Sequence, residues 1–111
     1  MAGKYIPQRA TGSAAIATSL TCTDPAELIC VKLNLSAAGG AAENFTITCN
    51  SAAGAAYDTV LFSQDMTTVT DLLWVPDQPI PITSGDVLDF AYNNGNTRTY
   101  GLEFVSRRVL V

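Results

Sequence analysis

Alternation between apolar and polar residues is the feature that most limits how this chain can fold. Every second residue from Ile29 to Leu35 is apolar, and the same pattern runs from Phe45 to Cys49. A period of two places one side of a strand in a core and the other side in water, as in antiparallel sheets. Helix-forming residues do not recur at helical spacing. The sequence therefore predicts an all-β fold built from antiparallel strands.

Further strand-like segments recur along the chain, with Gly, Pro and Asn between them. They cover roughly residues 14–22, 58–63, 68–75, 86–93 and 97–106, with 108–111 as an additional candidate. About eight short strands at such spacing are typical of an antiparallel β-sandwich or a small barrel. These two architectures are the ones that we expect.

The most distinct local signal is the stretch FAYNNGNTRTYGLEF, from Phe90 to Phe104. Two alternating runs flank Asn-Asn-Gly-Asn, whose residue types tolerate the backbone conformations of tight turns. The stretch predicts a hairpin in which the two runs pair with each other.

The beginning of the chain has a different character. Residues 1–13 show no period, and Tyr5 and Ile6 are the apolar anchors within them. We expect an extended N-terminal arm over residues 1–13, followed by one β-domain over residues 14–111. No apolar run reaches about 18 residues and no signal-peptide layout is visible, so we expect neither a membrane span nor Sec export.

Charge is sparse and unevenly distributed. Charged residues make up 14% of the sequence, and the formal net charge is −4. Residues 33–97 contain seven acidic residues and no basic one, whereas both ends of the chain are basic. This balance argues against nucleic acid as a partner, because phosphate binding requires clustered Lys and Arg. Two explanations of the asymmetry are open: it arises by chance, or the basic ends dock on an acidic surface. For the low charge, a surface rich in Ser, Thr and Asn and a surface covered by a partner are both open explanations.

The sequence offers little catalytic chemistry. It has no histidine, and Cys22, Cys30 and Cys49 fit no zinc-binding spacing. Glycine motifs that cradle phosphate are absent as well. Asp86 and Asp89 lie three residues apart, so on a strand they face opposite sides, and Asp86 is expected to accept hydrogen bonds from turn amides. We expect no enzyme activity, no cofactor and no metal.

For two apolar segments the sequence leaves more than one possible environment. Asp71 to Val75 is apolar on both faces around Trp74, so this strand is either central or covered by another subunit. Tyr92 and Tyr100 are expected in the core or in cross-strand pairs, with sugar stacking as an alternative. The C-terminal run from Ser106 to Val111 ends without a polar tail. It forms either a last strand or a strand added to a neighbour's sheet edge.

Residues 74–104, WVPDQPIPITSGDVLDFAYNNGNTRTYGLEF, resemble the last third of small β-sandwich virion proteins of tailed bacteriophages. In these proteins a Pro-rich crossover leads to a Gly-Asp turn, and a long hairpin then closes the sandwich. The first residues, MAGKYIPQRATGS, also resemble the arm by which such proteins grip a shell. The type that is most similar is the capsid decoration, or cement, protein.

The resemblance implies a non-enzymatic structural protein of the virion, which is made in the host cytoplasm and stabilises the outer capsid surface. Its expected partners are the major capsid protein, or another virion protein, and copies of itself in a homo-oligomer such as a trimer. A phage tail or fibre domain, or a carbohydrate-binding module, is the alternative. The expected interface residues come from the arm, the tryptophan and the C-terminal run: Lys4, Tyr5, Ile6, Arg9, Trp74, Arg107, Arg108, Val109 and Val111.

Overall fold

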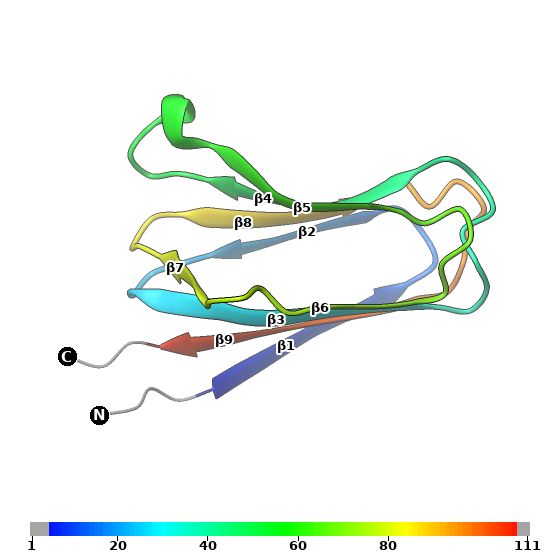
Figure 1. Ribbon diagram of the computed structural model, residues 1–111, viewed down its shortest axis with the longest axis horizontal. Coiled ribbons are helices and arrows are strands. Elements are labelled where there is room, and N and C mark those ends of the chain that lie inside the picture. The colour runs from blue at the N-terminus through cyan, green and yellow to red at the C-terminus, as the bar shows by residue number, and fades with distance from the viewer. Residues whose placement is uncertain (1–4, 109–111) are drawn as a thin grey trace.

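The computed structural model describes residues 5–108, which form two antiparallel sheets packed face to face (Figure 1). The strands in this range are β1 (Tyr5–Gly12), β2 (Ile16–Thr21), β3 (Ala26–Leu35), β4 (Asn44–Asn50), β5 (Thr59–Asp65), β6 (Asp71–Trp74), β7 (Ile80–Ile82), β8 (Val87–Tyr92) and β9 (Tyr100–Arg108), with one 3-10 turn, η1 (Ala55–Tyr57). Sheet A has the order β1-β9-β3-β6, with β7 also paired to β3, and sheet B has the order β2-β8-β4-β5. The all-β prediction is confirmed, and the architecture is a sandwich rather than a closed barrel.

The strands pair in a nested order. β1 pairs with β9, β2 with β8, β3 with both β6 and β7, and β4 with β5. The chain thus behaves like one long hairpin that has been rolled up, which is the topology of a jelly roll. Within residues 5–108 only β4 and β5 are consecutive strands that pair with each other.

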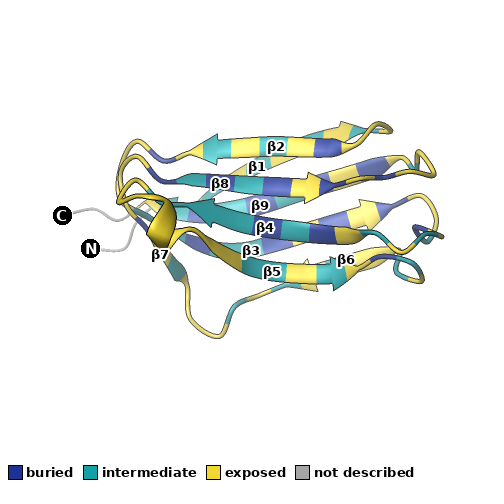
Figure 2. Cartoon of the chain, turned by 90° about the horizontal axis from the view of Figure 1, so that it is seen from above, coloured by how far each residue is buried: buried dark blue, intermediate teal, exposed yellow. Residues whose placement is uncertain are grey.

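The core lies between the sheets and is built from the inward positions of the strands (Figure 2). Val31, Leu33 and Leu35 of β3 are buried, as the alternation predicts. In β4, Phe45 and Ile47 are buried in the same way. Because successive side chains point to opposite faces, the residues between them lie on the outer faces of the sandwich.

The hairpin prediction for Phe90 to Phe104 is wrong. β8 belongs to sheet B and β9 to sheet A, so the Asn-rich segment crosses from one sheet to the other. The rings of Phe90 and Phe104 stack at 4.3 Å between centroids, and they meet across the core rather than along a ladder. The two runs are both amphipathic, but they bury their apolar sides against each other instead of sharing hydrogen bonds.

Asn94 holds this crossing in place. Its side chain is buried, and its backbone has a positive φ of 52°, which Asn adopts more readily than most residues. The side-chain amide donates to the carbonyl oxygens of Ser13 (3.2 Å), Ala14 (3.0 Å) and Arg98 (2.9 Å), while Oδ1 accepts from the Arg98 amide (2.9 Å). One side chain therefore ties the β1–β2 connection to the β8–β9 connection.

The extended arm that was expected over residues 1–13 is corrected for residues 5–12. Tyr5–Gly12 form the edge strand β1, which pairs with β9 along its whole length. Pro7 lacks an amide hydrogen, and a strand at the edge of a sheet tolerates this. The Pro-rich crossover contains the short strand β7 (Ile80–Ile82), which pairs with β3. Pro81 at its centre is tolerated in the same way as Pro7.

Replacing Asn94 with alanine is expected to lower the free energy of unfolding by about 2 to 4 kcal/mol, because four part-buried backbone groups lose the hydrogen bonds of one buried side chain. Urea unfolding followed by tryptophan fluorescence measures this change. Asn93 is the matched control, since its exposed side chain makes one hydrogen bond, to Glu43. Asn93→Ala should cost less than about 1 kcal/mol. Equal costs for the two variants would contradict the role of Asn94.

Candidate interaction surface

The groups considered above for catalysis or metal binding are a few carboxylates and three cysteines. Among residues 5–108, no group of three or more His, Cys, Asp or Glu side chains is placed to hold a metal ion. Cys22 is buried and Cys30 and Cys49 are half-buried, and all three are free thiols. Burial raises the pKa of Cys22 and of Cys49, so both thiols stay protonated at neutral pH.

Asp86 has the structural role that the sequence predicts. Its carboxylate accepts hydrogen bonds from the amides of Ala52 (2.8 Å) and Thr83 (3.0 Å) and from the Thr83 hydroxyl (3.1 Å). The amide of Ala52, followed by that of Thr83, lowers the pKa of this buried carboxyl. Asp89 lies on the outer face of sheet B, where it accepts from Ser19 Oγ. The two carboxylates therefore face opposite sides of the sheet.

The lowered pKa of Asp86 makes part of the stability dependent on pH. A depressed pKa in the folded state stabilises the fold above the unfolded value of about 3.9, and this contribution disappears as pH falls through the folded value. Asp86→Asn is expected to destabilise the protein clearly at neutral pH and much less in acid. Urea unfolding at neutral pH and in acid tests this. The control is Asp77→Asn, which changes an exposed loop residue. A loss of stability that is independent of pH would contradict the assignment.

The outer face of sheet A carries a row of paired charges across three strands. Glu103 of β9 lies between Arg9 of β1 and Lys32 of β3, at 2.5 Å from the Arg9 Nε and 2.6 Å from the Lys32 Nζ. The hydrogen bond from Lys32 and the nearby Arg9 lower the pKa of Glu103, and the same contact raises the pKa of Lys32. The cationic side chains remain largely exposed, at 71% for Arg9 and 53% for Lys32. Their unused N–H groups can therefore reach a partner.

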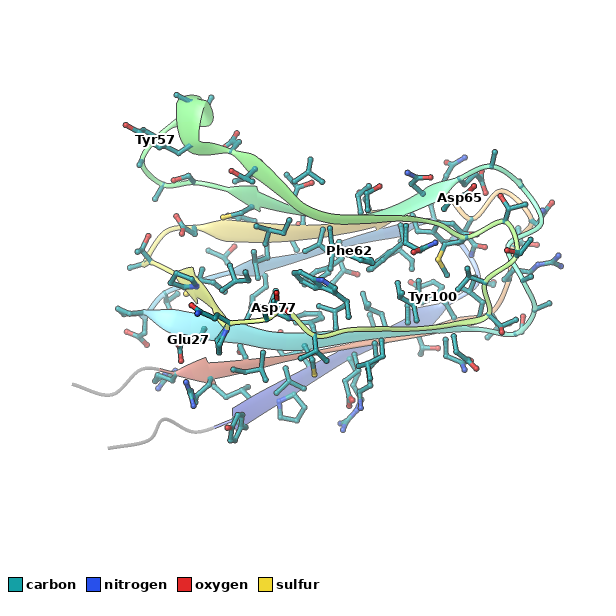
Figure 3. The ribbon with its side chains drawn as sticks, viewed as in Figure 1. Glu27, Tyr57, Phe62, Asp65, Asp77 and Tyr100 are labelled. Carbon is teal, nitrogen blue, oxygen red and sulfur yellow. The ribbon has the colours of Figure 1, made fainter. Side chains whose placement is uncertain are left out.

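A second set of charges lies at the far end of the same face. Arg107 pairs with Glu27 of β3, and its guanidinium lies over the Tyr5 ring at 5.9 Å (Figure 3 labels Glu27). On the inner side of the end of β9, outside this face, Arg108 lies 3.5 Å from Asp24. These ion pairs fix the orientation of the side chains on an exposed surface, where each pair adds little to stability.

Apolar side chains separate the two charged sets. Pro7, Val105 and Cys30 lie side by side in the register of β1, β9 and β3, between the Arg107 and Arg9 levels. On β6 and just beyond it, Leu73 is 63% exposed and Val75 is 57% exposed. The outer face of sheet A thus combines exposed apolar groups with oriented charges.

The outer face of sheet B is different. One of its rows consists of small residues, with Ala17, Ala91 and Thr46 side by side on β2, β8 and β4. Of the charged residues, Asp65 and Asp89 lie on this face, and within the described strands of sheet B no Lys or Arg occurs. The basic residues of the strands gather on sheet A instead.

A shallow recess interrupts the outer face of sheet A at Gly101. It has a volume of about 490 Å³ and is bordered by Arg9, Thr11, Lys32 and Glu103. A second recess of about 360 Å³ continues it toward β6 and shares Gly101 and Lys32 with the first. The recess exists because position 101 has no side chain between the neighbouring strands.

The structure brings together part of the predicted interface. Tyr5, Arg9 and Arg107 lie on the outer face of sheet A, because β1 and β9 are neighbours. Ile6 is half-buried on the inner side of β1, and Arg108 is exposed at the end of β9. Lys4, Val109 and Val111 lie outside the described residues.

Trp74 lies apart from these residues. Its ring stacks on that of Phe62 at 5.1 Å between centroids, half-buried at the open side of the sandwich, where Figure 3 shows Phe62 between the sheets. β6 is an edge strand rather than a central one, and its outward Leu73 is uncovered because no other described element packs on the outer face of sheet A. Tyr92 and Tyr100 are buried in the core.

Sequence reasoning missed Lys32, Leu73, Gly101 and Glu103 as members of this surface. Their outward positions on alternating strands can be read from the sequence. Their proximity cannot, because it depends on the pairing of strands that are distant in the sequence.

No model of a known protein family matches the chain, and no curated protein is significantly similar to it. None of the helices in residues 5–108 has the length and apolar character needed to cross a bilayer.

Proposed function

We propose that this protein is a non-enzymatic structural protein of a bacteriophage virion, and that it binds the outer surface of the capsid as a decoration protein. The outer face of sheet A carries the proposal. It is broad and presents exposed apolar groups between oriented charges, and such a surface fits a protein partner better than a small substrate. Jelly rolls are also common in capsid proteins, although a fold alone does not assign a function.

In this proposal a preformed sheet face binds the shell, whereas the resemblance implied a grip by an N-terminal arm. Tyr5 and Arg9 are already fixed on β1, so they do not need to order on the shell. A preformed face loses less conformational entropy on binding than a flexible arm. Many copies on one shell then add their modest individual affinities.

The alternative of a carbohydrate-binding or tail module relied on Trp74 and Tyr92. Tyr92 is 2% exposed, and the Trp74 ring is covered on one side by Phe62. Sugar stacking requires an open aromatic face, so the geometry gives this alternative less support.

Tyr5→Ala tests the proposed function. Tyr5 is 58% exposed beside Arg107, and its loss should weaken binding to the shell about 10-fold, as removal of an aromatic anchor does. The measurement is co-sedimentation of the purified protein with shells assembled from the capsid protein of the same phage genome. The free energy of unfolding should change by less than about 1 kcal/mol.

Val60→Ala is the matched control, since Val60 is 60% exposed on β5 of sheet B. It should bind shells like the unmodified protein. If the unmodified protein does not sediment with the shells, the proposed function is wrong. If both variants weaken binding equally, the assignment of the face is wrong.

A further inference from the structure

Gly101 is a glycine that neither the backbone nor the packing of this chain requires. It lies in β9, between β1 and β3, where it pairs with Thr11 and Asn34. Its φ is outside the left-handed region, and a Cβ atom at this position would meet no atom within 4 Å. Glycine within a strand is destabilising, and it often marks a place where another group approaches closely. The recess that it leaves therefore suggests an occupant from outside the chain.

An aromatic ring suits this recess. Aromatic side chains commonly pack over glycine in a sheet, where they replace the missing side-chain contacts. The neighbours Thr11 and Asn34 are too small to cover the glycine in this way. The recess is bordered by the long side chains of Arg9 and Lys32, and Leu73 borders its continuation. A tyrosine ring would find apolar contacts below it and cations at its rim.

The chain itself presents such a ring at another place. Tyr57 of η1 is 66% exposed, the highest value among the large apolar residues that the structure describes. η1 projects from sheet B at one end of the sandwich, as Figures 1 and 3 show. Figure 3 places Tyr100, the neighbour of Gly101, toward the opposite end. Tyr57 and the recess therefore cannot meet within one molecule.

The geometry points to a contact between copies, in which Tyr57 of one molecule occupies the Gly101 recess of the next. The charges are complementary, because Asp58 follows Tyr57 and the recess is bordered by two cations, Arg9 and Lys32, and by one carboxylate, that of Glu103. The two surfaces are different, so the contact is heterologous and closes into a ring or extends as a filament. This association takes place in solution and does not depend on the shell.

The test compares the unmodified protein with Tyr57→Ala and Gly101→Thr by light scattering over a concentration series. The unmodified protein should associate, and each variant should associate at least about 10-fold more weakly. An equimolar mixture of the two variants should form heterodimers, because one still carries Tyr57 and the other still carries the recess. Gly101→Thr should also raise the Tm by roughly 2 to 6 °C, since it removes a strand glycine that the fold does not need.

Two controls separate this contact from general surface effects. Ala91→Thr adds the same kind of side chain on the outer face of sheet B, and Tyr5→Ala removes the other exposed tyrosine. Both should associate like the unmodified protein. A monomeric unmodified protein, normal association of Gly101→Thr, a lowered Tm of that variant, or a mixture without heterodimers would each overturn the inference. If the unmodified protein associates in solution but does not sediment with the shells, the proposed function alone is wrong.

Discussion

The position of β9 between β1 and β3 is the constraint on which the rest of the structure depends. Glu103 shows its effect, because one carboxylate binds Arg9 and Lys32 from two strands that are far from β9 in the sequence. The same pairing places Gly101 between Thr11 and Asn34, and so creates the recess. Such pairing of distant segments slows folding, since a long loop must close before any contact is gained. The outer face of sheet A therefore exists only in the complete domain.

The crossings between the sheets make this pairing possible. At one end of the sandwich, Asn94 satisfies carbonyl groups of two connections with a single buried side chain. Elsewhere, Asp86 joins the loop at Ala52 to the turn at Thr83. Buried polar groups of this kind are costly unless every partner is present. They consequently favour one arrangement of the connections over others with equal apolar burial.

The alternation of residues was sufficient to predict an all-β fold, most of the strands and many buried positions, with a sandwich and a small barrel both left open. It was not sufficient to predict their partners, because the period of two is the same for a strand in either sheet. Asn93–Asn96 has the residue types of a hairpin turn, but those residues also suit a crossing between layers. The stacking of Phe90 on Phe104 across the core distinguishes the crossing from the hairpin. β1 was mistaken for an arm because Pro7 and Gly12 interrupt its pattern. Gly101 could be noticed as a strand glycine, whereas its uncovered position required the register.

The distribution of charge along the sequence becomes a distribution in space once the chain has folded. Arg9 and Arg107 come from its two basic ends, and the pairing of β1 with β9 places them on one face. The acidic middle of the sequence supplies β4, β5 and β8, and β2 contains no Lys or Arg either, so the described strands of sheet B carry no basic residue. A molecule with cations on one face and none on the other favours one orientation of a neighbour over the reverse. This asymmetry suits a head-to-tail contact, in which Asp58 approaches Arg9 and Lys32 of the next copy, beside the Glu103 carboxylate that both already bind.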